Sequence, residues 1–113
     1  MLLTPFVATS TDEATVEFVK EYKARYGEDK VPNQFAADGY DVIKVLYKAC
    51  TEAGITADMS VSDICEALKA TITSDGFSYD GLTGEGMTWD ASGAVSKAPR
   101  GMIIENGEYQ PLD

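Results

Sequence analysis

Three amphipathic helix patterns follow one another in this chain, and only short, glycine-rich strand patterns come after them. Each helix must bury its apolar stripe against another layer of structure. The few short strands expected here cannot cover three such stripes. The chain is therefore expected to be a compact α+β domain, a piece of a larger fold, or a subunit whose helix faces are covered by a second copy.

The first helix pattern follows a short apolar segment, which predicts a strand over residues 2–6. Ser10 and Glu13 have the spacing of a capping box, so the helix is expected to start there. Gly27 is expected to end it, because glycine readily adopts the conformation that closes a helix. The apolar stripe of this helix consists of Ala14, Phe18, Val19, Tyr22 and Tyr26.

The second helix is expected over about residues 37–53, with Gly54 as its C-cap. The third begins near Ser60, where Asp63 completes another capping box, so that the helical region spans residues 10–73. The second helix is predicted to be buried on more than one side, because its apolar positions are so many. One face consists of Tyr40, Ile43, Leu46, Tyr47 and Cys50, and Val42, Val45 and Ala49 widen it.

Short strands are expected over residues 77–113, where apolar residues come in brief runs between glycines. Gly81–Gly84 and Met87–Trp89 are predicted to be strands, with a turn directly after Trp89. Asn106-Gly107 is predicted to be the tip of a β-hairpin, because this dipeptide is the strongest signal for a type I′ turn. Trp89 is expected in the core, and Asp41 on the surface of its helix or in a local hydrogen bond.

The overall charge argues against a nucleic-acid partner. The 113 residues carry a net charge of −10, whereas binding to phosphates needs clustered lysine and arginine. No apolar run is long enough to span a membrane. The start, MLLTPFVATSTDE, lacks the features of a signal peptide. This indicates either a cytosolic protein or a chain cut from a longer precursor.

The residue types needed for catalysis are scarce. There is no histidine, and Cys50 and Cys65 are the two cysteines. A cysteine nucleophile would lack its base, and the pair is a poor zinc site. The two are expected to be small buried side chains, or alternatively a disulfide. Glu85 and Asp90 are not expected to form a glycosidase pair, and residues 90–93 lack the further ligands of a calcium loop. No catalytic residue, metal or cofactor is predicted, so an enzyme is disfavoured.

Three motifs in order carry a family resemblance: Phe35-Ala-Ala-Asp-Gly-Tyr-Asp41, then Gly81-Leu-Thr-Gly84 followed by Met87-Thr-Trp-Asp-Ala-Ser-Gly93, then Asn106-Gly107. Together they resemble the C-terminal part of substrate-binding proteins of ABC transporters. The branched-chain amino acid (Leu/Ile/Val) type, with the type I periplasmic-binding-protein fold, is the nearest resemblance. Each motif is weak alone, but their order and spacing extend over nearly the whole chain.

The resemblance implies an α/β fragment of a two-lobe fold, with one hinge strand, three helices and C-terminal short strands. The helices would pack on the parallel sheet of one lobe, and the natural polypeptide would begin upstream of Met1. The parent protein would be periplasmic or on the cell surface, capture an amino acid and deliver it to an ABC permease. A ligand-sensing regulatory domain of the same fold is the alternative. The isolated chain is expected to be marginally stable or to self-associate.

Phe35, Asp38 and Phe6 are the predicted ligand-binding residues. The resemblance implies that the segment leading into the second helix lies near the ligand cleft, where its side chains can contact the ligand. An aromatic ring suits the aliphatic side chain of an amino acid, and a carboxylate suits its α-ammonium group. Alternatively, Phe35 is a core residue and Asp38 is favoured by the helix dipole. Phe6, just after the hinge strand, is the third candidate. The family's main ligand residues lie upstream of the part that is matched.

Overall fold

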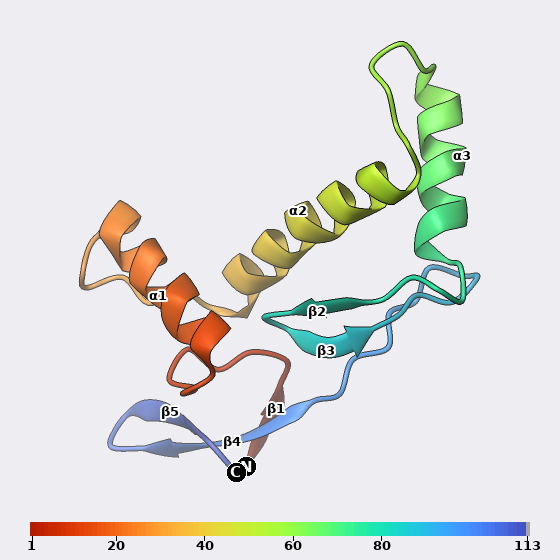
Figure 1. The fold of residues 1–113 in the computed structure, drawn as a ribbon. Helices are drawn as coiled ribbons and strands as arrows, with labels where there is room; N and C mark the ends of the chain where they lie inside the picture. The colour runs from red at the N-terminus through yellow and green to blue at the C-terminus, as the bar shows by residue number, and fades with distance from the viewer. Residues whose placement is uncertain (113) are drawn as a thin grey trace.

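The computed structural model describes residues 1–112, which form three helices and two small antiparallel sheets (Figure 1). One sheet has the strand order β1-β4-β5, and the other is the β2-β3 hairpin. The elements in chain order are β1 (Leu2–Thr4), α1 (Glu13–Tyr26), α2 (Gln34–Glu52), α3 (Val61–Ile72), β2 (Tyr79–Gly81), β3 (Gly84–Met87), β4 (Arg100–Glu105) and β5 (Glu108–Pro111).

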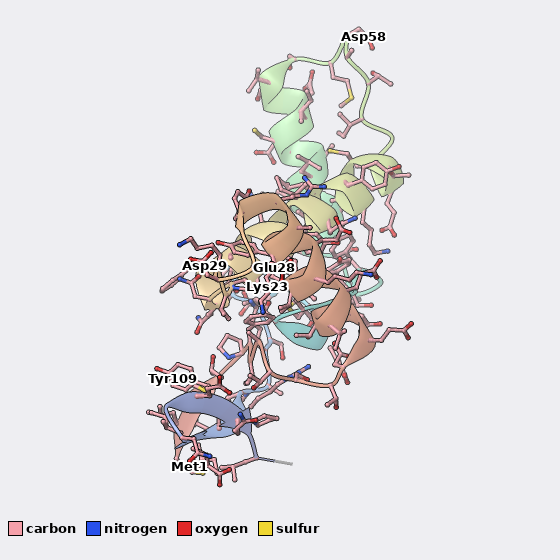
Figure 2. All side chains as sticks on the ribbon, turned by 90° about the vertical axis from the view of Figure 1, so that its left-hand side faces the viewer. Met1, Lys23, Glu28, Asp29, Asp58 and Tyr109 are labelled. Carbon is pink, nitrogen blue, oxygen red and sulfur yellow. The ribbon has the colours of Figure 1, made fainter. Side chains whose placement is uncertain are left out.

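The molecule is elongated, with extents of 52 × 29 × 20 Å. Its radius of gyration is 16.4 Å, whereas a compact domain of this length has about 13 Å. Met1 and Tyr109 lie at one end, with the three-stranded sheet, and Asp58 lies at the opposite end, in the connection between α2 and α3 (Figure 2). An elongated chain of this size leaves much of its apolar side-chain area uncovered.

The start of α1 differs from the prediction. Asp12 is the N-cap, and its Oδ2 accepts a hydrogen bond from the Thr15 N–H at 3.0 Å. Ser10 lies outside the helix, where its Oγ accepts a hydrogen bond from the Asp12 N–H. The predicted capping box of Ser10 and Glu13 is therefore wrong. Asp12 caps instead because its carboxylate lies three residues before an N–H group that has no partner within the helix. The predicted end at Gly27 is confirmed.

α2 begins at Gln34, three residues before its predicted start, because Asn33 caps it. The Asn33 Oδ1 atom accepts a hydrogen bond from the Ala36 N–H at 3.1 Å. As a result, Phe35 and Asp38 both lie within the helix, one turn apart, rather than Phe35 lying in the segment that leads into it. Two side chains that lie one turn apart share one face of a helix.

The other ends of α2 and α3 follow the predicted local chemistry. Beyond α2, Gly54 has φ 65°, and the Ile55 N–H donates to the carbonyl of Cys50 at 3.0 Å. This is the Schellman arrangement that glycine favours after a helix. At the start of α3, the Ser60 Oγ accepts a hydrogen bond from the Asp63 N–H at 3.1 Å. The predicted helix start at Ser60 is confirmed.

The buried face of α2 is not the one that the apolar residues predict. The buried residues are Ala37, Asp41, Val45 and Ala49, spaced four apart. Of the predicted face, Tyr40, Ile43, Leu46 and Tyr47 are all exposed, by 39–74%. The small alanines allow close packing on this stripe, while the larger apolar side chains point outward. Within residues 1–112, therefore, α2 is covered along one narrow stripe and keeps a wide apolar face in solvent.

Two small clusters make up the core. Phe6, Ala37 and Leu82 form one, with Phe18 and Val19 of α1 packed against it. Val45, Ala49 and Phe77 form the other, and Leu68, Ile72, Tyr79 and Trp89 pack around it. Trp89, which was predicted in the core, is half-buried and packs against this cluster, with its ring 5.8 Å from that of Phe77. The clusters join α2 to α1 and to α3 respectively.

The strands are shorter than predicted. β1 ends at Thr4 rather than at residue 6, since the Thr4 Oγ atom donates to the Phe6 carbonyl at 3.0 Å and bends the chain there. Leu82 and Thr83 form the turn between β2 and β3 rather than a strand. The Asn106-Gly107 hairpin is confirmed, with φ of 52° and 83° as a type I′ turn requires. β1 pairs antiparallel with β4, placing Leu2 opposite Met102.

The cysteines match neither expectation. Cys50 and Cys65 are both free, so the alternative of a disulfide between them is wrong. Cys50 is half-buried and Cys65 is exposed, so the description of both as buried side chains is also wrong for Cys65. Cys65 is exposed, whereas Leu68 and Ile72 of the same helix pack against the second cluster.

Phe77→Ala is expected to destabilise the chain by about 3–5 kcal/mol, because it empties the centre of the second cluster. Phe77 is 1% exposed. Urea unfolding followed by circular dichroism measures the change. Phe35→Ala is the matched control, since the Phe35 side chain is 76% exposed, and it should change stability by no more than about 0.5 kcal/mol. Equal effects of the two substitutions would contradict the assignment of the core.

Candidate functional site

A buried carboxylate connects α2 to the β2-β3 hairpin. Asp41 is 4% exposed. Its oxygens accept hydrogen bonds from the N–H groups of Leu82 and Thr83, each at 2.9 Å, and from the Thr83 hydroxyl at 2.7 Å. Three donors satisfy the charge that burial would otherwise penalise. The prediction that Asp41 lies on the helix surface or bonds locally is wrong, because its partners lie 41 and 42 residues away.

Gly81 is required by this contact. A Cβ atom on Gly81 would lie 2.6–2.8 Å from the carboxylate atoms of Asp41, closer than non-bonded atoms can approach. Glycine therefore lets the hairpin backbone reach the side chain of Asp41. The Gly81-Leu-Thr-Gly84 motif is thus a turn shaped to be held by an aspartate on α2.

Lys97 extends the network toward the start of α2. Its ammonium group donates to the Thr83 Oγ at 2.7 Å and to the Asp38 Oδ1 at 3.1 Å. Asp38 and Asp41 lie one turn apart on α2, so a single cation and one hydroxyl bridge the two carboxylates. The side chains of Lys97 and Asp38 remain 27% and 32% exposed. The outer end of the network is therefore accessible to solvent, and the inner end is buried.

The loop before Lys97 folds back on itself and is held closed by hydrogen bonds. Trp89 pairs with Val95 in an isolated β-bridge, and the Ser96 N–H donates to the carbonyl of Thr88 at 2.9 Å. At the tip, the Asp90 carboxylate accepts from the Ser92 hydroxyl and from the N–H groups of Ser92 and Ala94. The chain thereby returns to its starting point, and Lys97 emerges beside the hairpin.

Tyr79 lies near this network, and its surroundings affect the ionisation of its hydroxyl. Burial raises the pKa of the Tyr79 hydroxyl above its ordinary value, and the negative charge of Asp41 raises it further. Both effects disfavour the phenolate, since it would be a second negative charge in a poorly solvated place. Asp90, in contrast, is fully exposed, and its hydrogen bond from the Ser92 hydroxyl, then those from the backbone, lower the pKa of its carboxyl.

The three predicted ligand residues occupy different environments. Phe35 is 76% exposed. It is therefore not a core residue of the part of the chain that the structure describes, residues 1–112, as the alternative had it. Asp38 pairs with Lys97. Phe6 is 5% exposed and packs against Ala37 in the first cluster, with its ring 6.0 Å from that of Phe18. Phe35 and Asp38 thus share the accessible start of α2, and Phe6 lies in the core.

A groove lies elsewhere, between α1, α2 and the β2-β3 hairpin. Its volume is about 1200 Å³, and none of the three predicted residues lines it. Charged and aromatic side chains line it together, and the aromatic ones are Phe18, Tyr22, Tyr26, Tyr40 and Tyr79. The Phe18 and Tyr40 rings lie 5.1 Å apart, and the Tyr22 and Tyr26 rings 4.7 Å apart. The rings of the two pairs are tilted by 54° and 50°, so they form aromatic contacts without stacking face to face, and they make one part of a groove that charged side chains also line.

The sequence pattern did not identify Asp41 and Lys97 as members of the network, for different reasons. The signal for Asp41 was present: it is in phase with Ala37, Val45 and Ala49 on the buried stripe of α2. A charged residue in such a stripe must find donors from another segment. Lys97 had no such signal, because it lies in a loop without periodicity. Only the fold reveals its partner, 59 residues away.

Other kinds of site find little support in the part of the chain that the structure describes. Residues 1–112 contain no group of three or more side chains placed to hold a metal ion. None of the helices described is both long enough and apolar enough to cross a membrane.

Comparison with protein families gives one match that covers most of the chain. Residues 1–106 match the family described as periplasmic binding protein. The chain belongs to the periplasmic binding protein family. Comparison with curated proteins found no match. The family resemblance drawn from the three motifs is therefore confirmed, and so is the α/β fragment of a two-lobe fold that it implied.

Two solved structures of the family resemble this chain. One is assigned as a branched-chain amino acid ABC transporter from Rhodospirillum rubrum, with a TM-score of 0.71 and 28% identity over 98% of this chain. The other is the leucine-binding protein LivK from Thermotoga maritima, with a TM-score of 0.67 and 26% identity over 98% of this chain. The chain spans only 30% and 29% of the lengths of these two proteins.

Asp41→Asn is expected to destabilise the chain by about 2–4 kcal/mol, because the amide turns an N–H donor toward backbone N–H groups and leaves a buried donor unsatisfied. Urea unfolding measures the change. Asp90→Asn is the matched control, since Asp90 also accepts three hydrogen bonds from a turn but is exposed. If the two variants lose the same stability, Asp41 does not hold the hairpin.

Tyr79 should make the fold sensitive to alkali. Because its pKa is raised on folding, the stability it contributes is complete below about pH 10, the unfolded value. It is lost as pH rises through the higher folded value. The free energy of unfolding, measured in urea between pH 8 and 11, should therefore fall less steeply in Tyr79→Phe. Tyr47→Phe, on the exposed side of α2, is the control. An unchanged slope in Tyr79→Phe would show that burial does not disfavour its phenolate.

Proposed function

We propose that this chain is part of an extracytoplasmic receptor that captures a branched-chain amino acid and delivers it to an ABC permease. One observation carries the proposal: almost the whole chain matches part of two solved structures, one assigned as a branched-chain amino acid ABC transporter and the other a leucine-binding protein. Transport of this kind requires reversible capture and no covalent chemistry. The family's name supports a location outside the cytoplasmic membrane.

The proposed mechanism is hinge closure around the ligand. β1 lies near the start of the chain and β4 near its end, and the two pair side by side. We assign them as strands that cross between the lobes, as the family resemblance implies. The α2 helix and the hairpin held by Asp41 would move together as part of one lobe. A ligand that contacts both lobes would select the closed form, because only that form provides all its contacts.

The predicted ligand residues remain part of this proposal. Phe35 would cover the aliphatic side chain of the ligand, since its ring is exposed and lies one turn before Asp38. Asp38 would accept a hydrogen bond from the α-ammonium group. Phe6, being buried against Ala37, would support the start of α2 from beneath and contribute little direct contact. Burying an aromatic surface against an apolar side chain is the usual source of affinity for such ligands.

The aromatic groove and the outer face of α2 have a different role in the proposal. The related structures are about three times as long as this chain. We assign the groove and the exposed Ile43 and Tyr47 as surfaces that pack against the rest of the lobe. Ile43 and Tyr47 are exposed and lie one turn apart on α2, so they form an apolar patch that a further element can cover.

Leucine, isoleucine and valine should raise the melting temperature of the complete natural polypeptide that contains residues 1–113. A ligand that binds only the folded state stabilises it by about 2.7 kcal/mol when its free concentration is about 100 times Kd. Differential scanning fluorimetry over a panel of all common amino acids gives the ranking. Glucose at the same concentration is the control for non-specific effects.

The Phe35→Ala variant tests, in the same experiment, whether the Phe35 ring contacts the ligand. It should leave the melting temperature without ligand unchanged, because the ring is exposed, and should reduce the shift produced by leucine. If no amino acid shifts the melting temperature, the receptor proposal is wrong. If leucine produces a full shift in the variant, the receptor stands and Phe35 is not in the site.

A further inference from the structure

We propose that Thr4 is a positioning residue for ligand capture. Its buried hydroxyl links the end of β1 to Gln34, the first residue of α2, and thereby holds Phe35 in place. This inference rests on the proposed function, in which β1 crosses between the lobes and Phe35 covers the aliphatic side chain of the ligand. Thr4 itself would not touch the ligand, and it would act through the first turn of α2.

Thr4 is the buried residue of β1 within the described residues 1–112. It is 6% exposed, whereas Leu2 and Leu3 before it are 45% and 65% exposed. A polar side chain at a buried position has to find hydrogen-bond partners in the protein, because it has lost its contact with water. The partners of the Thr4 hydroxyl therefore show what the end of β1 is attached to.

The Thr4 hydroxyl serves two segments that are far apart in the chain. Its Oγ accepts a hydrogen bond from the Phe6 N–H at 3.3 Å, and it lies 3.0 Å from the Phe6 carbonyl oxygen and 3.3 Å from the Gln34 Oε1. A hydroxyl has a single proton to donate, so these two oxygens share it. Gln34 is 30 positions from Thr4. The side chain that shapes the bend after β1 thus also joins this bend to the start of α2.

A second contact, one turn further along α2, reinforces the first. Phe6 is 5% exposed and packs against Ala37. Gln34 and Ala37 are three residues apart, so they lie on the same face of the helix. Thr4 and Phe6 therefore hold the inner face of the first turn at two points. The Phe35 side chain, which is 76% exposed, lies outside this contact and is left accessible.

The first turn of a helix needs such support. Its N–H groups have no partners within the helix, so helix ends fray unless other groups hold them. The Asn33 cap satisfies one of these groups, the Ala36 N–H. The contact of Thr4 with Gln34 adds a link from another segment. A Phe35 ring on an ordered turn loses less conformational freedom when a ligand binds than a ring on a frayed turn, and this difference raises affinity.

The position of Thr4 at the end of β1 relates this support to the hinge. In the proposed mechanism β1 crosses between the lobes, so a change in the direction of the strand moves Thr4. Because Thr4 contacts the residue that precedes Phe35, the first turn of α2 would follow the hinge strand when the lobes close. Loss of the hydroxyl would loosen this link while leaving the packing of Phe6 on Ala37 in place.

The test removes the Thr4 hydroxyl and measures leucine binding by isothermal titration calorimetry on the complete natural polypeptide. Thr4→Val keeps the branched shape of the side chain and should raise the Kd for leucine about 3–10-fold, the effect of losing one hydrogen bond. Thr4→Ser retains the hydroxyl and should keep Kd within about twofold of the unsubstituted value. Gln34→Met removes the amide at the other end of the contact and should give the same loss as Thr4→Val.

The Phe35→Ala background distinguishes positioning of the ring from a general effect on the fold. Residues that act independently give losses that multiply, whereas residues that act through one another do not. If Thr4 acts by placing the Phe35 ring, Thr4→Val should raise Kd by less than about twofold once that ring is absent.

Thr15→Val is the matched control. Thr15 is also buried, with 1% of the residue exposed, and its hydroxyl donates to the Asp12 Oδ2 at 3.0 Å at the start of α1. This variant should lower the melting temperature without ligand, as Thr4→Val should, and should leave the Kd for leucine unchanged. A thermal melt of each variant without ligand verifies that it folds.

The failure of this inference can be told apart from that of the proposed function. If the unsubstituted protein binds leucine and Thr4→Val leaves Kd unchanged, the inference is overturned. It is also overturned if Thr4→Val weakens leucine equally with and without the Phe35 ring, since Thr4 then acts on the fold as a whole. If Thr4→Val does not fold, Gln34→Met makes the same comparison. If the unsubstituted protein binds no amino acid, the proposed function is wrong, and the inference falls with it.

Discussion

The structure depends on one buried carboxylate. Asp41 holds the turn between β2 and β3 against α2, and without its three acceptor contacts the N–H groups of Leu82 and Thr83 would be buried without partners. The position of the hairpin fixes the loop that follows it, and that loop brings Lys97 to Asp38. A single aspartate on the narrow buried stripe of a helix therefore determines where the accessible charge pair lies.

The same stripe explains why the fold is open. α2 uses small residues and Asp41 to meet the hairpin, so its large apolar side chains face away from it. Together with the aromatic groove, these side chains form surfaces that residues 1–112 do not cover. The periplasmic binding proteins that this chain resembles have much more polypeptide per molecule. A lobe shared with further strands accounts for both the exposed surface and the elongated shape.

Local features were predictable from residues close together in sequence. Gly27 ends α1, Ser60 starts α3, and Asn106-Gly107 forms a type I′ turn, because each depends on hydrogen bonds and backbone angles within a few residues. The Ser10 capping box failed in competition with an equally local alternative, Asp12. In the candidate site, Phe35 and Asp38 stay predicted ligand residues, and Asp41 was wrongly assigned to the surface, because a charged residue on a helix is usually solvated.

The sequence by itself determined the family, through the order of three motifs, and also the helix ends and the hairpin turn, since these follow from local conformational preferences. The tertiary structure alone decided which side of α2 is buried, that Gly81 must lack a side chain beside Asp41, and that Lys97 is the partner of Asp38. The contact of Asp41 with Leu82 joins residues that are 41 positions apart, and that of Asp38 with Lys97 joins residues that are 59 positions apart. They form only when packing has brought the segments together, and no periodicity in the chain encodes the pairing.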